Sequence, residues 1–267
     1  MKCLLGFVLS LTLSAATVDG IKLHSSTTGS GPKTVILVHG WTCDDTTWTE
    51  QVPALAKHYR VVTLDLPGHG KSESPKDEKF SMDLFARAIE AVRAEVKADR
   101  VVLAGHSMGS PVVIRYAQLY PQHTAALVMV DGLMPTTQSG NVNMAAAMAG
   151  PDGRKNREAM IRGMFSVSTT PAMQTKIINM MLGAPEATAV GAMNATFTAT
   201  TPPDYMLTMP TLGLYAGRSP MASAPAIQAH FPNSEYEQIP DTGHFLMLEK
   251  PEEFNRLLLA FLAKQKY

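Results

Sequence analysis

The chain has 267 residues, of which 45% are hydrophobic, and its 23 Lys and Arg residues balance 23 Asp and Glu residues, so that the formal net charge is zero. A chain of this length and apolar content can bury one sizeable core, and we expect a single domain over residues 17–267. The balanced charge leaves no basic excess that would hold a phosphate backbone. The composition therefore argues against a nucleic-acid partner.

The N-terminal residues predict a signal peptide. Met1-Lys2 gives a positive start, residues 4–13 are almost wholly apolar, and Ser14-Ala15-Ala16 offers small residues to a peptidase. The alternative is a membrane anchor, but the apolar run is shorter than the ~20 residues that a spanning helix needs. We expect residues 1–16 to be removed, and the mature protein to be secreted or periplasmic without a membrane span.

Two cysteines occur in the sequence, and only one of them lies outside the predicted signal peptide. Cys3 would leave with that peptide, so Cys43 would have no partner for an internal disulfide. A lone cysteine is more often a small buried apolar residue than a reactive one.

Short apolar runs alternate with helical patterns along most of the chain. Strands are predicted over residues 34–39, 60–65, 100–105, 126–131, 211–217 and 235–239, and helices over 48–58, 82–96, 222–230 and from 251 onward. The first three of these strands, over residues 34–39, 60–65 and 100–105, are continuously apolar, as expected when both faces of a sheet are covered. The sequence therefore predicts an α/β fold with a mostly parallel, doubly wound sheet of about seven to eight strands.

This alternation is interrupted from about residue 132 to residue 208. Ala-rich helical stretches there lie between Gly and Pro breaks, and methionines recur through the segment. We predict a helical lid inserted after the strand that ends at Asp131. The methionines are either ordinary core fillers or a deformable wall for an acyl group, since flexible thioethers suit both roles.

Gly105-His106-Ser107-Met108-Gly109 follows a predicted strand and precedes an apolar helical stretch. A nucleophile elbow needs this context of strand, tight turn and helix, with glycines where neighbouring backbones approach closely. The alternative is an ordinary glycine turn. If the motif is a nucleophile elbow, Ser107 projects at the carboxyl edge of the sheet as a nucleophile.

Serine needs a positioned base, and His244 is the candidate among eight histidines because its loop follows the last predicted strand. His106 should point away from the nucleophile, and His39 should brace its loop. After His39-Gly40, the backbone N–H of Trp41 can join that of Met108 to form an oxyanion hole.

The segments HGW, DLPGHGKS, GHSMG and GHFLMLEKPEEF resemble the α/β-hydrolase superfamily, especially its lid-bearing serine esterases, and the likeness runs from about Thr34 to the C-terminus. The resemblance implies a nucleophile, acid, histidine order along the chain and no cofactor. It also implies that Asp65, Gly68 and Gly70 shape a loop and are not catalytic.

The chain departs from this family at the acid. The usual acid follows the strand here written TLGLYAG, but the next residues, Arg218-Ser219-Pro220-Met221, contain no carboxylate. Asp131 ends the preceding strand, and some family members resemble this arrangement. Asp131 is therefore the hypothesised partner of His244, although an aspartate at a strand end can also cap the following segment.

These residues predict a carboxylesterase-like enzyme acting on a small or medium lipophilic ester. Amides, lactones, thioesters, diketone C–C bonds and perhydrolysis remain open, because the same residues serve them. A hydrolase-derived protein that binds a small ligand is a further alternative. We expect no metal site, since no His, Cys and carboxylate set has ligand spacing, and no pattern predicts an oligomeric state.

Overall fold

The computed structural model describes residues 16–134, 143–199, 205–221 and 223–265, so the predicted signal peptide lies outside the described residues except for Ala16. The strands are β1 (Thr17–Val18), β2 (Ile21–Lys22), β3 (Ser25–Thr28), β4 (Thr34–Val38), β5 (Arg60–Leu64), β6 (Val101–His106), β7 (Thr124–Val130), β8 (Thr211–Ala216) and β9 (Ser234–Ile239). The α-helices are α1 (Val52–Leu55), α2 (Met82–Glu95), α3 (Gly109–Leu119), α4 (Asn143–Ala146), α5 (Gly153–Arg162), α6 (Pro171–Gly183), α7 (Glu186–Thr198), α8 (Ala224–His230), α9 (Leu246–Glu249) and α10 (Pro251–Lys264). Two 3-10 helices, η1 (Asp45–Trp48) and η2 (Pro121–His123), complete the described elements.

Seven strands form one twisted sheet in the order β3-β5-β4-β6-β7-β8-β9. Only β3 runs antiparallel to its neighbour, and every other pair is parallel. Every residue of β4, β6 and β7 is buried, which explains their continuous apolar sequences. The predicted fold class is confirmed. Because the chain leaves β4 toward β5 on one side and later returns with β6 on the other, the sheet has a topological switch point at its centre, where α/β proteins bind ligands.

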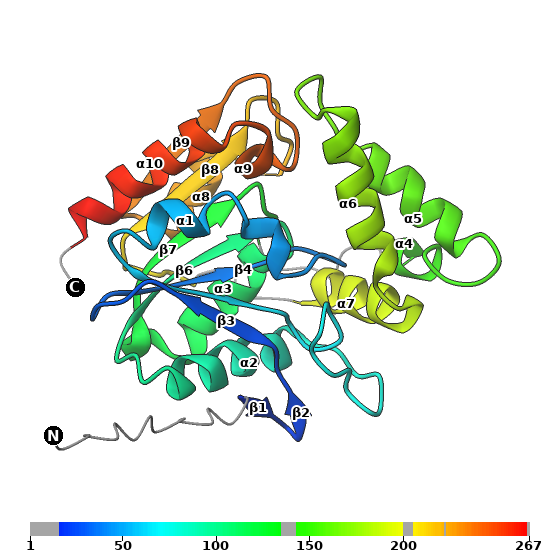
Figure 1. Ribbon diagram of the computed structural model, residues 1–267, viewed down its shortest axis with the longest axis horizontal. Coiled ribbons are helices and arrows are strands. Elements are labelled where there is room, and N and C mark those ends of the chain that lie inside the picture. The colour runs from blue at the N-terminus through cyan, green and yellow to red at the C-terminus, as the bar shows by residue number, and fades with distance from the viewer. Residues whose placement is uncertain (1–15, 135–142, 200–204, 222, 266–267) are drawn as a thin grey trace, which may run out of the picture.

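Helices cover both faces of the sheet (Figure 1). The amphipathic helices α2 and α3 pack on each other below the sheet in that view, and α1 and α10 contact each other above it. Each helix buries one apolar stripe, such as Phe85, Ile89 and Val92 on α2. The result is one continuous core.

Helices α4 to α7 form the insertion between β7 and β8 and lie together beside the sheet (Figure 1). Two hydrogen bonds join α7 to loops at the carboxyl edge of the sheet. The Trp41 indole N–H donates to the Ala189 carbonyl at 2.7 Å, and the Thr188 hydroxyl donates to the Gly68 carbonyl at 2.8 Å. The helical content predicted for this segment is therefore present, and it is anchored next to the switch point.

The methionines of the insertion take up several environments. Met148, Met181 and Met193 are buried in the core, whereas Met206 is 59% exposed. Core filling therefore accounts for some of them, and both roles considered above stay open for the half-buried ones.

The main difference from the predicted elements lies at the edge of the sheet. Strand β3 has the sequence SSTT and is largely exposed, so no apolar pattern marks it, and pairing with β5 alone makes it a strand. The helix expected over residues 48–58 is shorter and consists of η1 followed by the single turn of α1.

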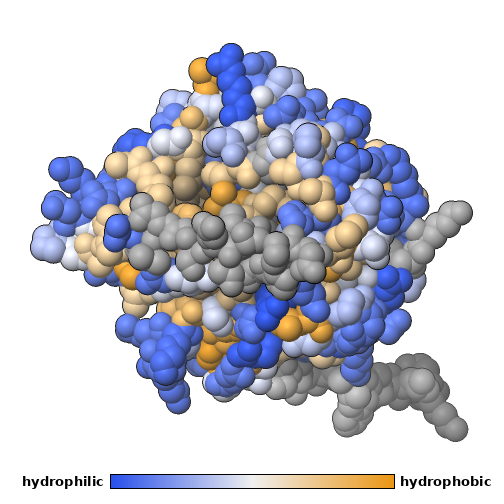
Figure 2. Space-filling view, turned by 180° about the vertical axis from the view of Figure 1, so that it is seen from behind, coloured by the Kyte–Doolittle hydropathy of each residue, from blue (hydrophilic) through white to orange (hydrophobic). Residues whose placement is uncertain are grey.

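On the face opposite to that of Figure 1, apolar residues gather toward the middle and hydrophilic residues form most of the surround (Figure 2). None of the helices in the part of the chain that the structure describes is both long and apolar enough to cross a bilayer.

Candidate active site

Ser107 occupies a sharp turn between β6 and α3. It has a positive φ of 54°, which residues other than glycine rarely adopt, and its N–H donates to the Val130 carbonyl at 2.9 Å. A Cβ at Gly105 would collide with the carbonyl oxygen of Gly109, and one at Gly109 would lie 2.6 Å from the carbonyl oxygen of Val38. The two glycines are therefore required for the backbone to turn this closely, as the sequence predicts.

The structure brings together Ser107, His244 and Asp131, which come from three different loops at the carboxyl ends of the strands. The Ser107 Oγ lies 2.8 Å from the His244 Nε2, and the His244 Nδ1 lies 2.7 Å from the Asp131 Oδ2. The side chains of His244 and Asp131 are buried, at 7% and 4% exposure. The three groups form an unbroken hydrogen-bonded line from a hydroxyl, through an imidazole, to a carboxylate.

Asp131 is held by backbone groups of β8 as well as by His244. Its own N–H donates to the Leu214 carbonyl at 2.9 Å, and its Oδ1 accepts from the Ala216 N–H at 3.0 Å. Burial opposes the charge on this side chain, but hydrogen bonds and charge from His244, with help from the Ser219 hydroxyl and the Ala216 amide, keep the pKa of Asp131 below its ordinary value. The carboxyl is thus held as a carboxylate that faces the imidazole.

The other two histidines near the site, His106 and His39, make their hydrogen bonds to backbone groups. His106 donates from Nε2 to the His244 carbonyl at 2.8 Å, and burial, followed by the neighbouring His244, lowers the pKa of His106 to about 3. His39 accepts from the Leu66 N–H at 3.0 Å and donates to the Gly40 carbonyl at 2.8 Å. His106 therefore supports the backbone of His244 as a neutral ring, and His39 braces its loop as predicted.

The two residues predicted to supply oxyanion donors, Trp41 and Met108, are each the chain neighbour of a residue at the Ser107 turn. The loop after β4 packs directly on the serine, since a Cβ at Gly40 would lie 2.9 Å from the Ser107 Cβ. Trp41 follows Gly40, and Met108 is the N-cap of α3, where helix N–H groups have no partner within the helix. The assignment of the Trp41 and Met108 backbone amides as oxyanion donors stays a prediction.

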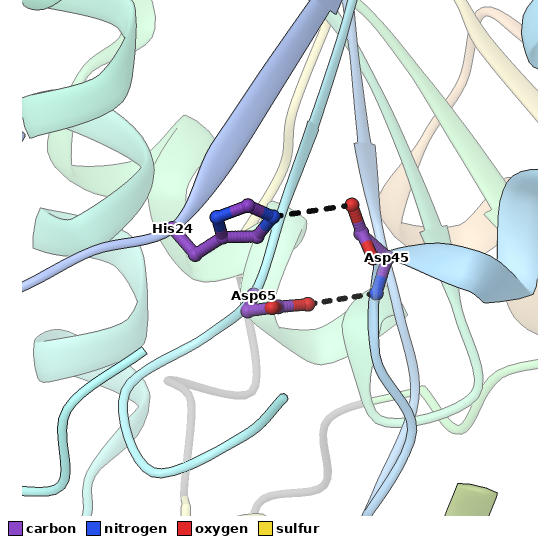
Figure 3. Close-up of side chains that lie close together, drawn as sticks. All are labelled: His24, Asp45 and Asp65. Atoms are coloured by element: carbon purple, nitrogen blue, oxygen red, sulfur yellow. Dashed lines mark hydrogen bonds and ion pairs between the residues drawn. The ribbon is translucent and has the colours of Figure 1, made fainter. Parts of the chain in front are cut away.

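A second cluster consists of His24, Asp45 and Asp65, which come from three segments: the residue before β3, the start of η1 and the residue after β5 (Figure 3). One ligand atom from each residue lies within 4.8 Å of the others, which is a donor set of the type that divalent cations accept. No sequence pattern marks this group, because its members are far apart in the chain and have no ligand spacing. The figure shows His24 pointing at Asp45, with 3.6 Å between its Nε2 and the Asp45 Oδ2.

The hydrogen bonds within this second cluster give Asp65 a structural task. Its Oδ1 accepts from the Asp45 N–H at 2.7 Å and its Oδ2 from the Lys71 N–H at 2.8 Å, so it links the loop after β4 to the loop after β5. Burial, followed by the charge of Asp65, raises the pKa of Asp45. Gly70 has a φ of 52°, and a Cβ there would collide with the Asp65 carboxyl. Asp65 and Gly70 thus shape these loops, as the family resemblance implies.

The chain is similar in sequence to several known proteins. The family model described as alpha/beta hydrolase fold matches residues 33–159. A 2-hydroxy-6-oxononadienedioate/2-hydroxy-6-oxononatrienedioate hydrolase of Burkholderia vietnamiensis is 28% identical over 91% of this chain and 92% of its own length. The dihydrolipoyllysine-residue acetyltransferase component of an acetoin cleaving system of Pseudomonas putida is 30% identical over 88% of this chain, a match that spans 65% of that longer protein.

Among solved structures, a thermophilic esterase from Thermogutta terrifontis superposes with a TM-score of 0.84 and is 27% identical, covering 94% of this chain and 97% of the esterase. The chain belongs to the α/β-hydrolase superfamily. Its relatives support a hydrolase of this fold, and they include both an esterase and a hydrolase named for a dienedioate substrate.

Proposed function

We propose that the chain is a serine hydrolase that cleaves a small or medium lipophilic carboxylic ester through an acyl-enzyme. The observation that carries this proposal is the hydrogen-bonded line from the Ser107 hydroxyl through His244 to Asp131, with 2.8 Å and 2.7 Å between the bonded atoms. In the superfamily fold, a serine so placed beside a base acts as a nucleophile.

In the proposed reaction, the Ser107 Oγ attacks the ester carbonyl carbon while its proton passes to the His244 Nε2. The carbonyl oxygen becomes an oxyanion that accepts from the backbone N–H groups of Trp41 and Met108. The imidazolium returns its proton to the departing alcohol, and Asp131 stabilises the positive ring during this step. Water then attacks the acyl-enzyme, with His244 again as base, and releases the acid and free Ser107.

The insertion supports an uncharged substrate. Within its described part, Arg154 and Arg157 of α5 donate to the carbonyls of Leu182 and Ala184, at 3.2 Å and 3.4 Å, and Arg162 pairs with Glu158 on the surface. Arg154 and Arg157 therefore bind carbonyls at the C-terminal end of α6, where cations are favourable, and Arg162 is exposed to solvent. This arrangement favours a lipophilic ester over a charged acid.

A second candidate is hydrolytic C–C cleavage of a diketone, which is favoured by the likeness to the Burkholderia vietnamiensis hydrolase over 91% of this chain. Amide, lactone or thioester hydrolysis would use the same three residues. We also propose that residues 1–16 direct secretion and that the insertion serves as a lid. The bonds from α7 to Trp41 and Gly68 support the lid.

The test is hydrolysis of p-nitrophenyl esters of increasing acyl length by the purified protein and its Ser107→Ala variant, with Ser74→Ala, an exposed serine, as the matched control. We expect turnover at short or medium acyl length, a loss of about 10⁴-fold or more in kcat/KM for Ser107→Ala, and no change for Ser74→Ala. Turnover of a vinylogous diketone but of no ester would favour the second candidate. Equal ester turnover by wild type and Ser107→Ala would contradict the serine mechanism.

A further inference from the structure

Glu249 ends α9, five residues after His244, and its half-buried carboxylate joins two segments that are distant in sequence. The Oε2 accepts from the Gly243 N–H at 2.6 Å and from the Ser166 hydroxyl at 2.8 Å, and the Oε1 accepts from the Thr169 hydroxyl at 2.6 Å. Ser166 and Thr169 belong to the turn of residues 163–170 between α5 and α6, which we call the α5–α6 turn. One carboxylate therefore links the insertion to the loop that carries His244.

The α5–α6 turn also contacts this loop directly through backbone groups. The His244 N–H donates to the Met164 carbonyl at 3.0 Å, and the Ser168 hydroxyl donates to the Asp241 carbonyl at 2.6 Å. A Cβ at Gly243 would lie 2.7 Å from the Met164 carbonyl oxygen. The glycine thus permits the turn to pack against the backbone on the N-terminal side of His244.

The α5–α6 turn is ordered around the same two hydroxyls. The Ser166 N–H donates to the Thr169 hydroxyl at 2.8 Å, and the Ser168 N–H donates to the Ser166 hydroxyl at 3.0 Å. Both hydroxyls are therefore held in place by the turn and present their protons to Glu249. A carboxylate is the side chain suited to receive them, because it only accepts hydrogen bonds and makes stronger ones than a neutral group does.

The position of the imidazole depends on this backbone. Both ring nitrogens of His244 make short bonds, to Ser107 and to Asp131, so a small shift of the loop lengthens at least one of them. On the opposite side, the His244 carbonyl is held by His106. The backbone of His244 is thus fixed from the sheet through its carbonyl and from the insertion through its N–H.

We propose that Glu249 is a positioning residue for His244: its carboxylate holds the α5–α6 turn against the His244 loop and so keeps the imidazole aligned between Ser107 and Asp131. This inference rests on the proposed role of His244 as the base that activates Ser107. It makes the insertion a part of the catalytic alignment in addition to its place beside the substrate site.

The test compares Glu249→Gln with Glu252→Gln, an exposed glutamate on the first turn of α10. The main measurement is the second-order rate at which a fluorophosphonate labels Ser107, followed by intact mass and peptide mapping, because this reaction needs an aligned base but no ester substrate. We expect labelling by Glu249→Gln to slow by about 10- to 100-fold, since a misplacement of about 1 Å can cost about 100-fold in rate. Glu252→Gln should label within twofold of wild type.

Ester hydrolysis supplies the second readout. For a short p-nitrophenyl ester, kcat should fall with the labelling rate in Glu249→Gln while KM stays within about twofold, since misalignment of a base affects chemistry more than binding. Ser166→Ala should give a smaller decrease. The double variant should be no slower than Glu249→Gln alone, because both changes remove the same interaction.

A folded Glu249→Gln protein that labels within twofold of wild type would overturn the inference. If that variant does not fold, Ser166→Ala decides in the same way, since it removes a single hydroxyl from a surface turn. If the wild-type protein is labelled at Ser107 but hydrolyses no ester, the proposed substrate is overturned. The role of Glu249 is then decided by the labelling rates of Glu249→Gln and wild type alone. Absence of wild-type labelling would overturn both proposals together.

Discussion

Replacing Asp131 by Asn tests whether this residue is the charge partner of His244, and the structure indicates how the amide would orient. The Asp131 Oδ1 accepts from the buried Ala216 N–H at 3.0 Å, and the Oδ2 faces the His244 Nδ1 at 2.7 Å. An asparagine that keeps its oxygen toward Ala216 presents its NH₂ group to His244. The ring would then have to accept at Nδ1 and carry its proton on Nε2, where it faces Ser107 and cannot act as a base.

The opposite orientation of the amide is disfavoured by the same neighbour. It would place the NH₂ group against the Ala216 N–H and leave that buried donor without an acceptor, which costs about 1–3 kcal/mol. At least a tenfold excess of the inactive orientation follows from the middle of that range. Loss of the carboxylate charge beside the imidazolium adds to this effect, and the same change in a well-studied serine protease lowers kcat by ~10⁴-fold.

The assay is steady-state ester hydrolysis by Asp131→Asn, with thermal unfolding to show that the variant folds. Asp241→Asn is the matched control, since Asp241 is exposed in the same loop as His244 and its positive φ of 56° is tolerated by asparagine. We expect kcat to fall by about 10³- to 10⁴-fold in Asp131→Asn and by less than threefold in the control. Activity of folded Asp131→Asn within a few-fold of wild type would refute the assignment and leave Asp131 a structural residue.

Two further predictions concern buried groups. Burial lowers the pKa of His69 and of His106 to about 3, so between pH 6.5 and 3 the unfolded chain binds protons that the folded chain does not. Stability therefore falls as the pH decreases through this window, by about 1.4 kcal/mol per pH unit for each ring. Denaturant unfolding at pH 6.5, 6.0, 5.5 and 5.0 should show this slope, His69→Gln should make it shallower, and a constant stability over that range would contradict the reasoning. Burial also raises the pKa of the Cys43 thiol to about 12, so a disulfide reagent at pH 8 should label Cys43 at least 100-fold more slowly in the folded protein than in denaturant. Peptide mass spectrometry separates Cys43 from Cys3, and equal rates in the two states would disprove the burial of the thiol.

The buried strands with continuously apolar sequences could be predicted from the sequence. Strands β4, β5, β6, β7 and β8 each lie within two residues of their expected bounds, because full burial on both faces leaves an unmistakable apolar run. The turn at Ser107 was equally predictable, since its two glycines have a steric reason. By contrast, β3 has polar side chains and depends on its partner, so the sequence contains no local signal for it.

For the candidate site, the sequence indicated which residues meet but not what supports them. His244 and Asp131 could be expected together because both follow strands whose carboxyl ends share one edge of the sheet. The hydrogen bonds from Ser166 and Thr169 to Glu249 connect residues that are 83 and 80 positions apart in the sequence, and they join the insertion to the core. The approach of His24 to Asp45 and Asp65 is likewise a product of tertiary packing. Such contacts between loops have no periodicity that could predict them.

The location of the acid at the end of β7 follows from the geometry of the sheet. Because β7 and β8 are parallel neighbours, their carboxyl ends lie roughly 4.8 Å apart, and a side chain from either end can reach the same imidazole. In this chain the end of β7 supplies the carboxylate, while the last residue of β8 supplies the Ala216 amide and the segment after β8 supplies the Ser219 hydroxyl. A second carboxylate after β8 would place two negative charges beside one imidazole, and these charges would repel each other. With Asp131 present, the ring therefore needs no acid after β8. The sequence feature that at first suggests a lost acid is therefore compatible with a complete hydrogen-bonded line to Ser107.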